Sequence, residues 1–200
     1  MQVADPAVSR RKFDREVAQL RDLGSTLVAR GMWVMQAEFP VVKVAFATVN
    51  CRPWTIPFAV RIDFTDYDVQ PLAITFVEPF TDRELMPAEM QTKLLRAMPG
   101  EAVQQIEVNG QPVAMQMAMP QLVELYQHYP QMPHIPGFLC LPGTRAYHAH
   151  PAHTGDPWEI HRAVGEGKLF NLLETVWRYG TAPINQVQVN LGLAQSEIPA

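Results

Sequence analysis

Residues 61–80 read RIDFTDYDVQPLAITFVEPF, and this stretch decides how the chain folds. Its first part, RIDF, is the end of a strand-like run that stops at Phe64. A short Asp-Tyr turn follows, and after Pro71 apolar side chains alternate with other residues at Leu72, Ile74 and Phe76. A period of two is typical of a strand with one buried face. The stretch therefore predicts two strands joined by a turn.

The residues before this stretch predict one helix and then further strands. Residues 9–23, SRRKFDREVAQLRDL, carry apolar side chains at helical spacing beneath charged neighbours, with Ser9 placed as an N-cap. From Met32 the pattern changes to runs rich in Val, Phe and Thr: WVMQAEF, VVKVAFATV and WTIPFAVRIDF. Together with residues 61–80 these runs predict an α+β fold with an antiparallel β-meander.

Residues 133–161, PHIPGFLCLPGTRAYHAHPAHTGDPWEIH, concentrate the side chains that carry chemistry. The segment holds five of the six histidines and one of the two cysteines, and it is too rich in Pro and Gly to be one helix. Thiolate and imidazole groups are the ligands that zinc prefers, and four of them close a tetrahedral site. The candidate ligands are Cys140, His148, His150, His153 and His161.

A plainer interpretation of the same segment also stands. Histidines are common in surface loops, Tyr147 and Trp158 can cover an edge of the core, and Cys140 can be a small buried apolar residue. The density of four histidines within residues 148–161 favours metal binding over this interpretation.

Composition bounds the remaining possibilities. The 200 residues with 48% hydrophobic content fit one domain. A net charge of -4 without a basic stripe makes nucleic acid an unexpected partner, and no apolar run is long enough to span a membrane. Two cysteines do not make a disulfide framework. We expect a cytoplasmic protein that binds neither nucleic acid nor membrane.

The order of these features resembles that of ubiquitin-conjugating (E2) enzymes, whose UBC fold is shared by RWD-like domains. Residues 61–80 are similar to their "FP-x-x-YP-x-x-PP-x-V-x-F" passage, residues 9–23 to their first helix, and Phe138-Leu139-Cys140-Leu141 to their "I-C-L" segment. A Trp at position 158 and an apolar C-terminal helix follow, as in that family. The resemblance implies a catalytic Cys140, with His134 in the loop before it.

Two departures from the E2 pattern stand out. The His-Pro-Asn tripeptide, whose Asn supports the oxyanion, is replaced by Pro133-His134-Ile135-Pro136, and no Asn lies near Cys140 in the sequence. In addition, residues 81–130 form an insertion. We expect helices in it at residues 88–98 and 121–129 and a hairpin turn at Asn109-Gly110. The expected division is a tail at 1–8, one E2-like domain at 9–180 and an extension at 181–200, with a late strand at 187–193.

The segment YHAHPAHTGDPWEIHRAVGEGKLFNLLE is also similar to small bacterial proteins that are predicted to bind metal through Cys, Glu and His. These accompany ubiquitin-like proteins, E1-like activating enzymes and JAB-type deubiquitinases, so the likeness implies those partners. It adds Glu159 to the ligands Cys140, His148, His150, His153 and His161. Both resemblances indicate a bacterial ubiquitin-like conjugation pathway.

The two resemblances give Cys140 incompatible roles. As a nucleophile it forms a thioester and needs a free thiolate, with His134 or another His as base. As a ligand in a closed zinc site it cannot attack. The sequence favours a zinc-binding E2-like component, with an active E2-type transferase as the alternative. A zinc hydrolase with Glu159 as base is a third, weaker hypothesis, because no HExxH motif is present.

Overall fold

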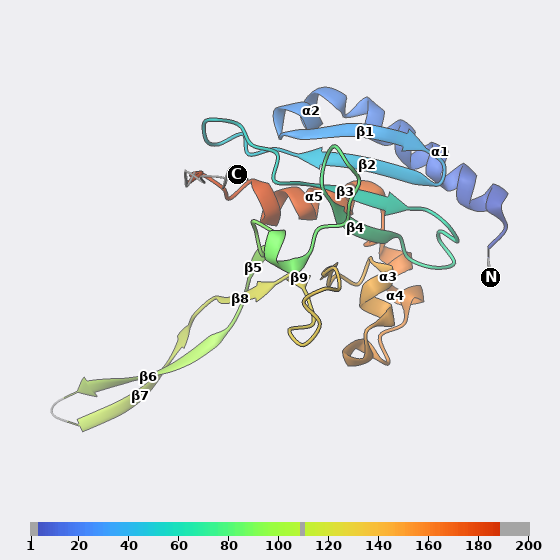
Figure 1. Cartoon of the computed structure of the whole chain (residues 1–200). Coiled ribbons are helices and arrows are strands. Elements are labelled where there is room, and N and C mark those ends of the chain that lie inside the picture. The colour runs from blue at the N-terminus through green and yellow to red at the C-terminus, as the bar shows by residue number, and fades with distance from the viewer. Residues whose placement is uncertain (1–3, 109–110, 189–200) are drawn as a thin grey trace, which may run out of the picture.

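The computed structural model describes residues 4–108 and 111–188. A four-stranded antiparallel sheet forms the body of the molecule. Residues 95–108 and 111–164 lie beyond its β4 edge, whereas residues 169–176 return to pack against one face of the sheet (Figure 1). The α+β class expected from the sequence is therefore confirmed. No helix in the described part of the chain has both the length and the apolar character needed to cross a membrane.

Helix α1 (Pro6–Asp22) begins earlier than the sequence pattern predicted. Its N-cap is Asp5, whose Oδ1 accepts a hydrogen bond from the Ala7 amide at 2.8 Å, and proline occupies the first helical position. The prediction that Ser9 caps the helix is wrong, because Ser9 lies inside the helix and is buried. The expected tail of residues 1–8 is thus partly helical.

The predicted meander is confirmed as a sheet with the order β1-β2-β3-β4. A short helix, α2 (Gly24–Ala29), leads into it. The four strands are β1 (Met32–Glu38), β2 (Val41–Phe46), β3 (Phe58–Asp63) and β4 (Ala73–Val77). Each strand pairs with the next along the chain. A tight turn joins β1 to β2, and longer loops, residues 47–57 and 64–72, make the other two connections.

One face of the sheet makes the core. The register aligns Val44 with Val60 and Val60 with Phe76, so these side chains form a row across three strands. They pack in one cluster with the apolar side chains of α1 and of α5 (Leu169–Val176). The predicted apolar C-terminal helix is therefore confirmed, and it is a core element.

The opposite face of the sheet is covered by the loop that follows β4. Lys43 Nζ lies 2.9 Å from Asp82 Oδ1, and Arg61 lies 2.9 Å from Glu84 Oε1. These ion pairs join neighbouring strands to residues 78–85, which fold back over the sheet. The loop thus shields a face whose side chains are partly polar.

The predicted helices in the insertion are wrong. Residues 88–98 hold only the end of a single 3₁₀ turn, Pro87–Glu89, and then strand β5 (Leu95–Met98). Residues 121–129 hold β8 (Gln121–Glu124) and β9 (Tyr126–Gln127). Pairing of β5 with β8, which are distant in sequence, overrides the local helical spacing.

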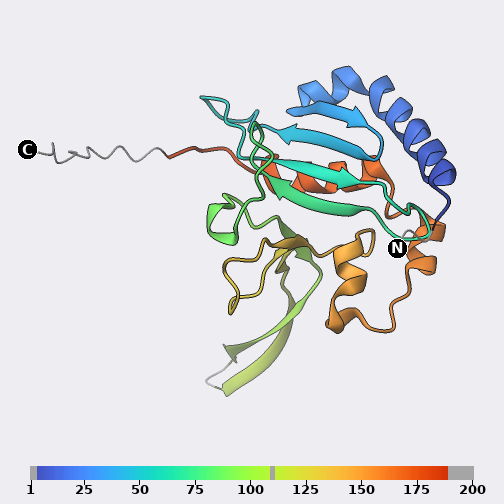
Figure 2. The same ribbon diagram turned by 45° about the vertical axis from the view of Figure 1, so that its right-hand side comes forward.

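The predicted hairpin in the insertion is confirmed. Strand β6 (Glu101–Val108) pairs with β7 (Gln111–Ala118) over eight residue pairs, from Glu101 with Ala118 to Val108 with Gln111. The predicted turn at Asn109-Gly110 lies outside the described residues. In both views this hairpin projects from the body of the molecule (Figures 1 and 2).

The site segment runs below the β4 edge as a chain of short elements. They are β10 (Phe138–Leu139), α3 (Arg145–Ala149), the 3₁₀ turn Pro151–His153 and α4 (Trp158–Val164). Farther along the chain, a π-helical turn, Trp177–Thr181, follows α5. Figure 2 shows α3 and α4 grouped beside the sheet. The late strand predicted at residues 187–193 falls mostly outside the described residues, and residues 187–188 are not in a strand.

Candidate functional site

Cys140 directly follows β10 and is held there by the backbone. Strand β10 pairs with β9, and the Cys140 amide donates a hydrogen bond of 2.8 Å to the carbonyl of Leu125. The thiol is half-buried and unpaired with any other cysteine. The predicted nucleophile or ligand therefore sits at a fixed point between the insertion and the helices that follow.

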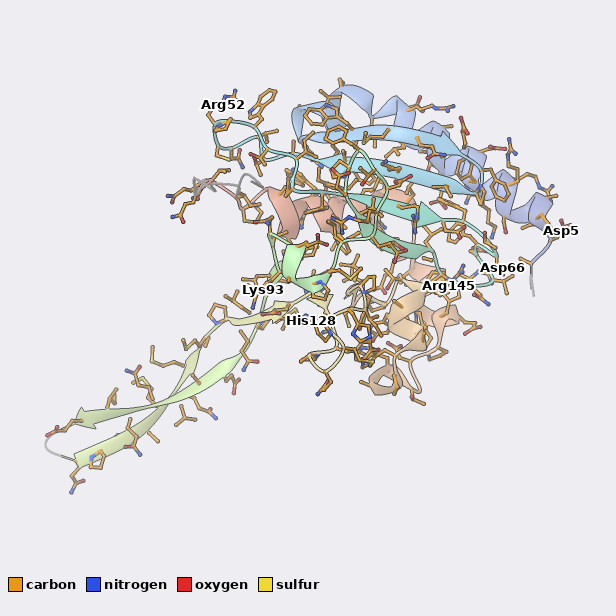
Figure 3. The ribbon with its side chains drawn as sticks, in the orientation of Figure 1. Asp5, Arg52, Asp66, Lys93, His128 and Arg145 are labelled. Atoms are coloured by element: carbon orange, nitrogen blue, oxygen red, sulfur yellow. The ribbon has the colours of Figure 1, made fainter. Side chains whose placement is uncertain are left out.

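Two side chains anchor the loop after Cys140. The buried Thr144 hydroxyl lies within hydrogen-bonding distance of the carbonyls of Leu139 and Leu141, at 2.8 and 2.9 Å. Arg145 reaches back to the loop before β4, where its guanidinium donates to the carbonyls of Thr65 and Pro71 (Figure 3). These contacts tie the site to the sheet, and neither residue was singled out from the sequence.

His153 is the histidine that contacts Cys140. Its Nε2 lies 3.3 Å from the Cys140 Sγ, which is within hydrogen-bonding distance for sulfur. The Tyr147 ring stacks on the His153 ring, with centroids 3.7 Å apart and planes 17° from parallel. Tyr147 therefore limits how the imidazole can turn, and the result is a Cys-His pair with an oriented base.

Tyr147 is itself held by a chain of charged groups. Its hydroxyl donates to Asp156 Oδ2 at 2.7 Å, and Asp156 Oδ1 accepts from His161 Nε2 at 2.6 Å. His161 Nδ1 bonds to Glu166. Neither Asp156 nor Glu166 was singled out as a site residue from the sequence, so the network was missed. Its one sequence signal is the crowding of these residues around the histidines.

The pKa shifts in this chain follow from its hydrogen bonds. Burial lowers the pKa of His161, but its two carboxylate partners, Asp156 and Glu166, outweigh burial and raise it. The hydrogen bonds from Tyr147 and His161 lower the pKa of Asp156. The hydrogen bond to Asp156 and burial raise the pKa of Tyr147 to about 12. The two carboxylates thus favour the protonated form of the imidazole that lies between them.

The remaining predicted site residues lie apart from Cys140 or point elsewhere. His148 places Nδ1 3.0 Å from the Asp156 carbonyl and Nε2 2.6 Å from the Pro142 carbonyl. His150 accepts a hydrogen bond from the Ala152 amide and stacks against Phe138. Glu159 and His134 are exposed, and no hydrogen bond or ion pair joins either of them to another described residue.

These contacts test whether the predicted ligands fit a zinc ion. A metal-bound histidine must offer a free nitrogen lone pair. Both nitrogens of His148 face carbonyl oxygens and both nitrogens of His161 face carboxylates, so neither ring offers one in this arrangement. Within residues 4–108 and 111–188, no three His, Cys, Asp or Glu side chains are grouped to hold a metal. The ligand set proposed from the sequence does not fit zinc as arranged here.

A shallow pocket opens beside His153. It has a volume of about 460 Å³ and is lined by residues of α3, of α4 and of the loop between them, among them His148, His153, Asp156 and Trp158.

Burial raises the pKa of the Cys140 thiol, and the nearby charge of Arg96 only partly offsets this. Burial thus favours the neutral form of the thiol, whose sulfur lies beside the His153 imidazole.

Comparison with known proteins gives two findings. A family model described as Y4jH-like, of the Y4jH family, matches residues 4–184. The chain is also 36% identical over 196 residues to a protein of Sinorhizobium fredii that carries the description "Uncharacterized protein y4jH". The match covers 97% of this chain and 92% of that relative. It therefore includes the sheet, the insertion and the site segment.

Proposed function

This chain belongs to the Y4jH-like family, and we propose that it is an E2-type transferase that carries the C-terminal acyl group of a ubiquitin-like protein as a thioester on Cys140. The observation that carries the proposal is the contact of 3.3 Å between Cys140 Sγ and His153 Nε2. A thiol beside an oriented imidazole is the arrangement that nucleophilic catalysis by cysteine requires.

The order of elements supports the same proposal. An N-terminal helix, a four-stranded meander, a cysteine directly after the short strand β10 and an apolar helix follow one another, as in the UBC fold. The cysteine lies beyond the β4 edge, in a segment fastened to the sheet by Thr144 and Arg145. We extend the α+β assignment to a UBC-like fold on this basis.

The reaction would proceed by exchange of thioesters. The Cys140 sulfur attacks the thioester carbonyl carbon of a charged E1-like enzyme, so a new carbon–sulfur bond forms and the bond to the E1 sulfur breaks. The proton of the Cys140 thiol passes to His153 Nε2 and then to the departing sulfur. Because burial holds the resting thiol neutral, this base is needed at the moment of attack. His134 is exposed and has no described contact with Cys140, so we assign the base role to His153 instead.

The test uses a small thioester in place of the pathway's own partners. Protein is incubated with the acetylglycyl thioester of mercaptoethanesulfonate, and the adducts at Cys140 and Cys51 are counted separately by peptide mass spectrometry. We expect an adduct on Cys140 that dithiothreitol removes, that Cys140→Ala abolishes, and that forms about tenfold more slowly in His153→Gln. Equal rates in the wild type and in His153→Gln would refute the role of the pair.

A zinc-binding component of the same pathway is the second candidate. Two of its expected ligands, Cys140 and His153, are in contact, and His150 lies beside His153 with ring centroids 5.6 Å apart. Elemental mass spectrometry of protein purified without a metal-affinity tag decides between the candidates. If the wild type contains about one zinc per chain and Cys140→Ala does not, the metal site becomes the preferred proposal in place of the transferase. The expected partners, a ubiquitin-like protein, an E1-like enzyme and a JAB-type deubiquitinase, are common to both candidates.

A further inference from the structure

Arg96 is a half-buried cation to which the described residues give no partner. It lies in β5, at the base of the projecting hairpin. Its Nε is sealed from solvent and has no hydrogen-bond acceptor, and within residues 4–108 and 111–188 its guanidinium forms no ion pair. A buried donor without an acceptor costs free energy, so such a group in a native fold calls for an explanation. The same side chain lines a pocket, from which a ligand can bring an acceptor to the rest of the guanidinium.

The backbone places Arg96 close to Cys140. The Cys140 amide donates to the Leu125 carbonyl, and the Leu125 amide donates to the Leu94 carbonyl at 3.0 Å. Three chain segments therefore lie side by side, with Cys140 on one outer segment and Arg96 on the other. Neighbouring strands are about 4.8 Å apart, so the two outer segments are separated by about 10 Å, most of which an extended arginine side chain covers. Consistent with this, the charge of Arg96 acts to lower the pKa of the Cys140 thiol, although burial raises it by more.

A pocket of about 210 Å³ lies between Arg96 and the chain that directly follows Cys140. Arg96 forms one part of its wall, and the residues that come directly after Cys140, Leu141 to Gly143, form another. Glu166 also lines the pocket, and one oxygen of its carboxylate bonds to His161. Among the described residues of the wall, Arg96 is the only cation. The pocket therefore has a positive side chain in its wall, opposite the residues that directly follow Cys140.

We propose that Arg96 and this pocket form a subsite for a negatively charged oxygen derived from a carboxyl group, bound beside Cys140. Its occupant in the reaction is the oxyanion that forms when the acyl carbonyl is attacked, a charge that a preorganised guanidinium stabilises. That occupant rests on the proposed function, whereas binding of a carboxylate does not. Arg96 thus takes the place of the oxyanion-supporting Asn that the sequence lacks, and the insertion acquires a role in the site.

The test compares two alkylating reagents of nearly equal size, iodoacetate and iodoacetamide. Both transfer their CH₂ carbon to the Cys140 sulfur and release iodide, but only iodoacetate carries a carboxylate. Rates at Cys140 are measured by peptide mass spectrometry in the wild type, Arg96→Gln and Arg96→Lys. Lys93→Gln is the matched control, because Lys93 precedes Arg96 by three residues in the sequence but is exposed and pairs with Glu124.

We expect the ratio of the iodoacetate rate to the iodoacetamide rate to fall about fivefold in Arg96→Gln, which corresponds to a partly exposed ion pair. Arg96→Lys should retain part of the ratio, and Lys93→Gln all of it. Cys51, which is buried, reports on unfolding in each variant. An unchanged ratio in Arg96→Gln, or equal slowing of both reagents, would overturn the subsite. If Arg96→Gln does not fold, the ratio in Arg96→Lys decides.

The two proposals fail separately. If the ratio falls but no thioester forms on Cys140, the proposal of a carboxylate subsite stands and the proposal of a transferase fails. Thioester formation with an unchanged ratio would do the reverse.

Discussion

The β1–β4 sheet and the β6–β7 hairpin are both antiparallel and both show alternating side chains, but they bury very different amounts of surface. In the sheet, Val44, Val60 and Phe58 are fully buried. Along β7 every residue is exposed, and Met115 and Met117 keep 45% and 44% of their surface. The alternation is alike, so the difference comes from what packs on each face: helices α1 and α5 in one case, and no described element in the other.

This difference separates stability from function within one chain. Apolar burial supplies most of the free energy of folding, so the sheet and its helices hold the molecule together. A two-stranded hairpin alone is marginally stable, so β6 and β7 contribute little to the core. The site lies between the two regions: Cys140 is bonded to the insertion through Leu125, and its loop is bonded to the sheet through Thr144 and Arg145.

The largest effect should come from the core face of the sheet. Phe58 is fully buried and its ring packs against Phe46 and Phe76. We expect Phe58→Ala to lower the free energy of unfolding by about 3–5 kcal/mol, because it removes this burial and leaves a cavity. Urea unfolding followed by circular dichroism measures the loss. A loss below about 1 kcal/mol would mean that the sheet is not the principal core.

A smaller loss is expected at the buried carboxylate that joins α1 to α5. Glu16 accepts a hydrogen bond from the Tyr67 hydroxyl and another from the Leu169 amide, both at 2.8 Å. Glu16→Ala leaves these donors without an acceptor, so we expect a loss of about 1–3 kcal/mol in urea unfolding. Glu101→Ala, an exposed acid in the hairpin, is the control and should change little. Equal losses in the two variants would contradict the division between core and hairpin.

Thr144→Val should have a moderate effect on stability and a local effect on Cys140. The nearly isosteric valine lacks the hydroxyl that bonds to the carbonyls on both sides of Cys140, so we expect a loss of about 1 kcal/mol. Iodoacetamide should also alkylate Cys140 faster, because the loop is less restrained. Thr154→Val is the control, since its hydroxyl bonds only to an exposed loop carbonyl. If Cys140 reacts at the wild-type rate, Thr144 does not position it.

The contribution of His161 should depend on pH in a defined direction. Its pKa is raised in the folded protein, so its stabilisation is present at low pH and is lost as pH rises through the folded pKa. The lowered pKa of Asp156 has the opposite consequence, since its contribution is lost as pH falls through that pKa. The difference in melting temperature between the wild type and His161→Gln should therefore be greatest in mildly acidic solution. A difference that grows above pH 8 would have the wrong sign.

The smallest effect is expected in the hairpin. Met115 and Met117 lie on one face of β7 and contact no core residue, so Met115→Ser and Met117→Ser should change the free energy of unfolding by less than about 0.5 kcal/mol each. The same urea experiment measures this. A loss of more than about 1 kcal/mol from either substitution would show that the hairpin is part of the stable core.

Much of the fold could be predicted where local pattern and final packing agree. The alternation of Leu72, Ile74 and Phe76 predicted a strand, and the spacing in residues 9–23 predicted a helix, because the side that is apolar in sequence is the side that is buried. The prediction of helices in the insertion was wrong because local pattern and final packing disagree there. Leu95–Met98 and Gln121–Glu124 have helical spacing locally, but they pair with each other across 23 or more residues, which no local pattern records.

The candidate site shows the same limit. The sequence by itself determined that the thiol and five histidines gather in residues 133–161, since their count and composition are local properties. Only the tertiary structure decided which histidine faces Cys140, that Tyr147, Asp156, His161 and Glu166 form one hydrogen-bonded chain, and that Arg96 arrives from the insertion. Hydrogen bonds and ion pairs depend on distances of a few ångströms between segments far apart in the chain. Those distances are set by how the core packs.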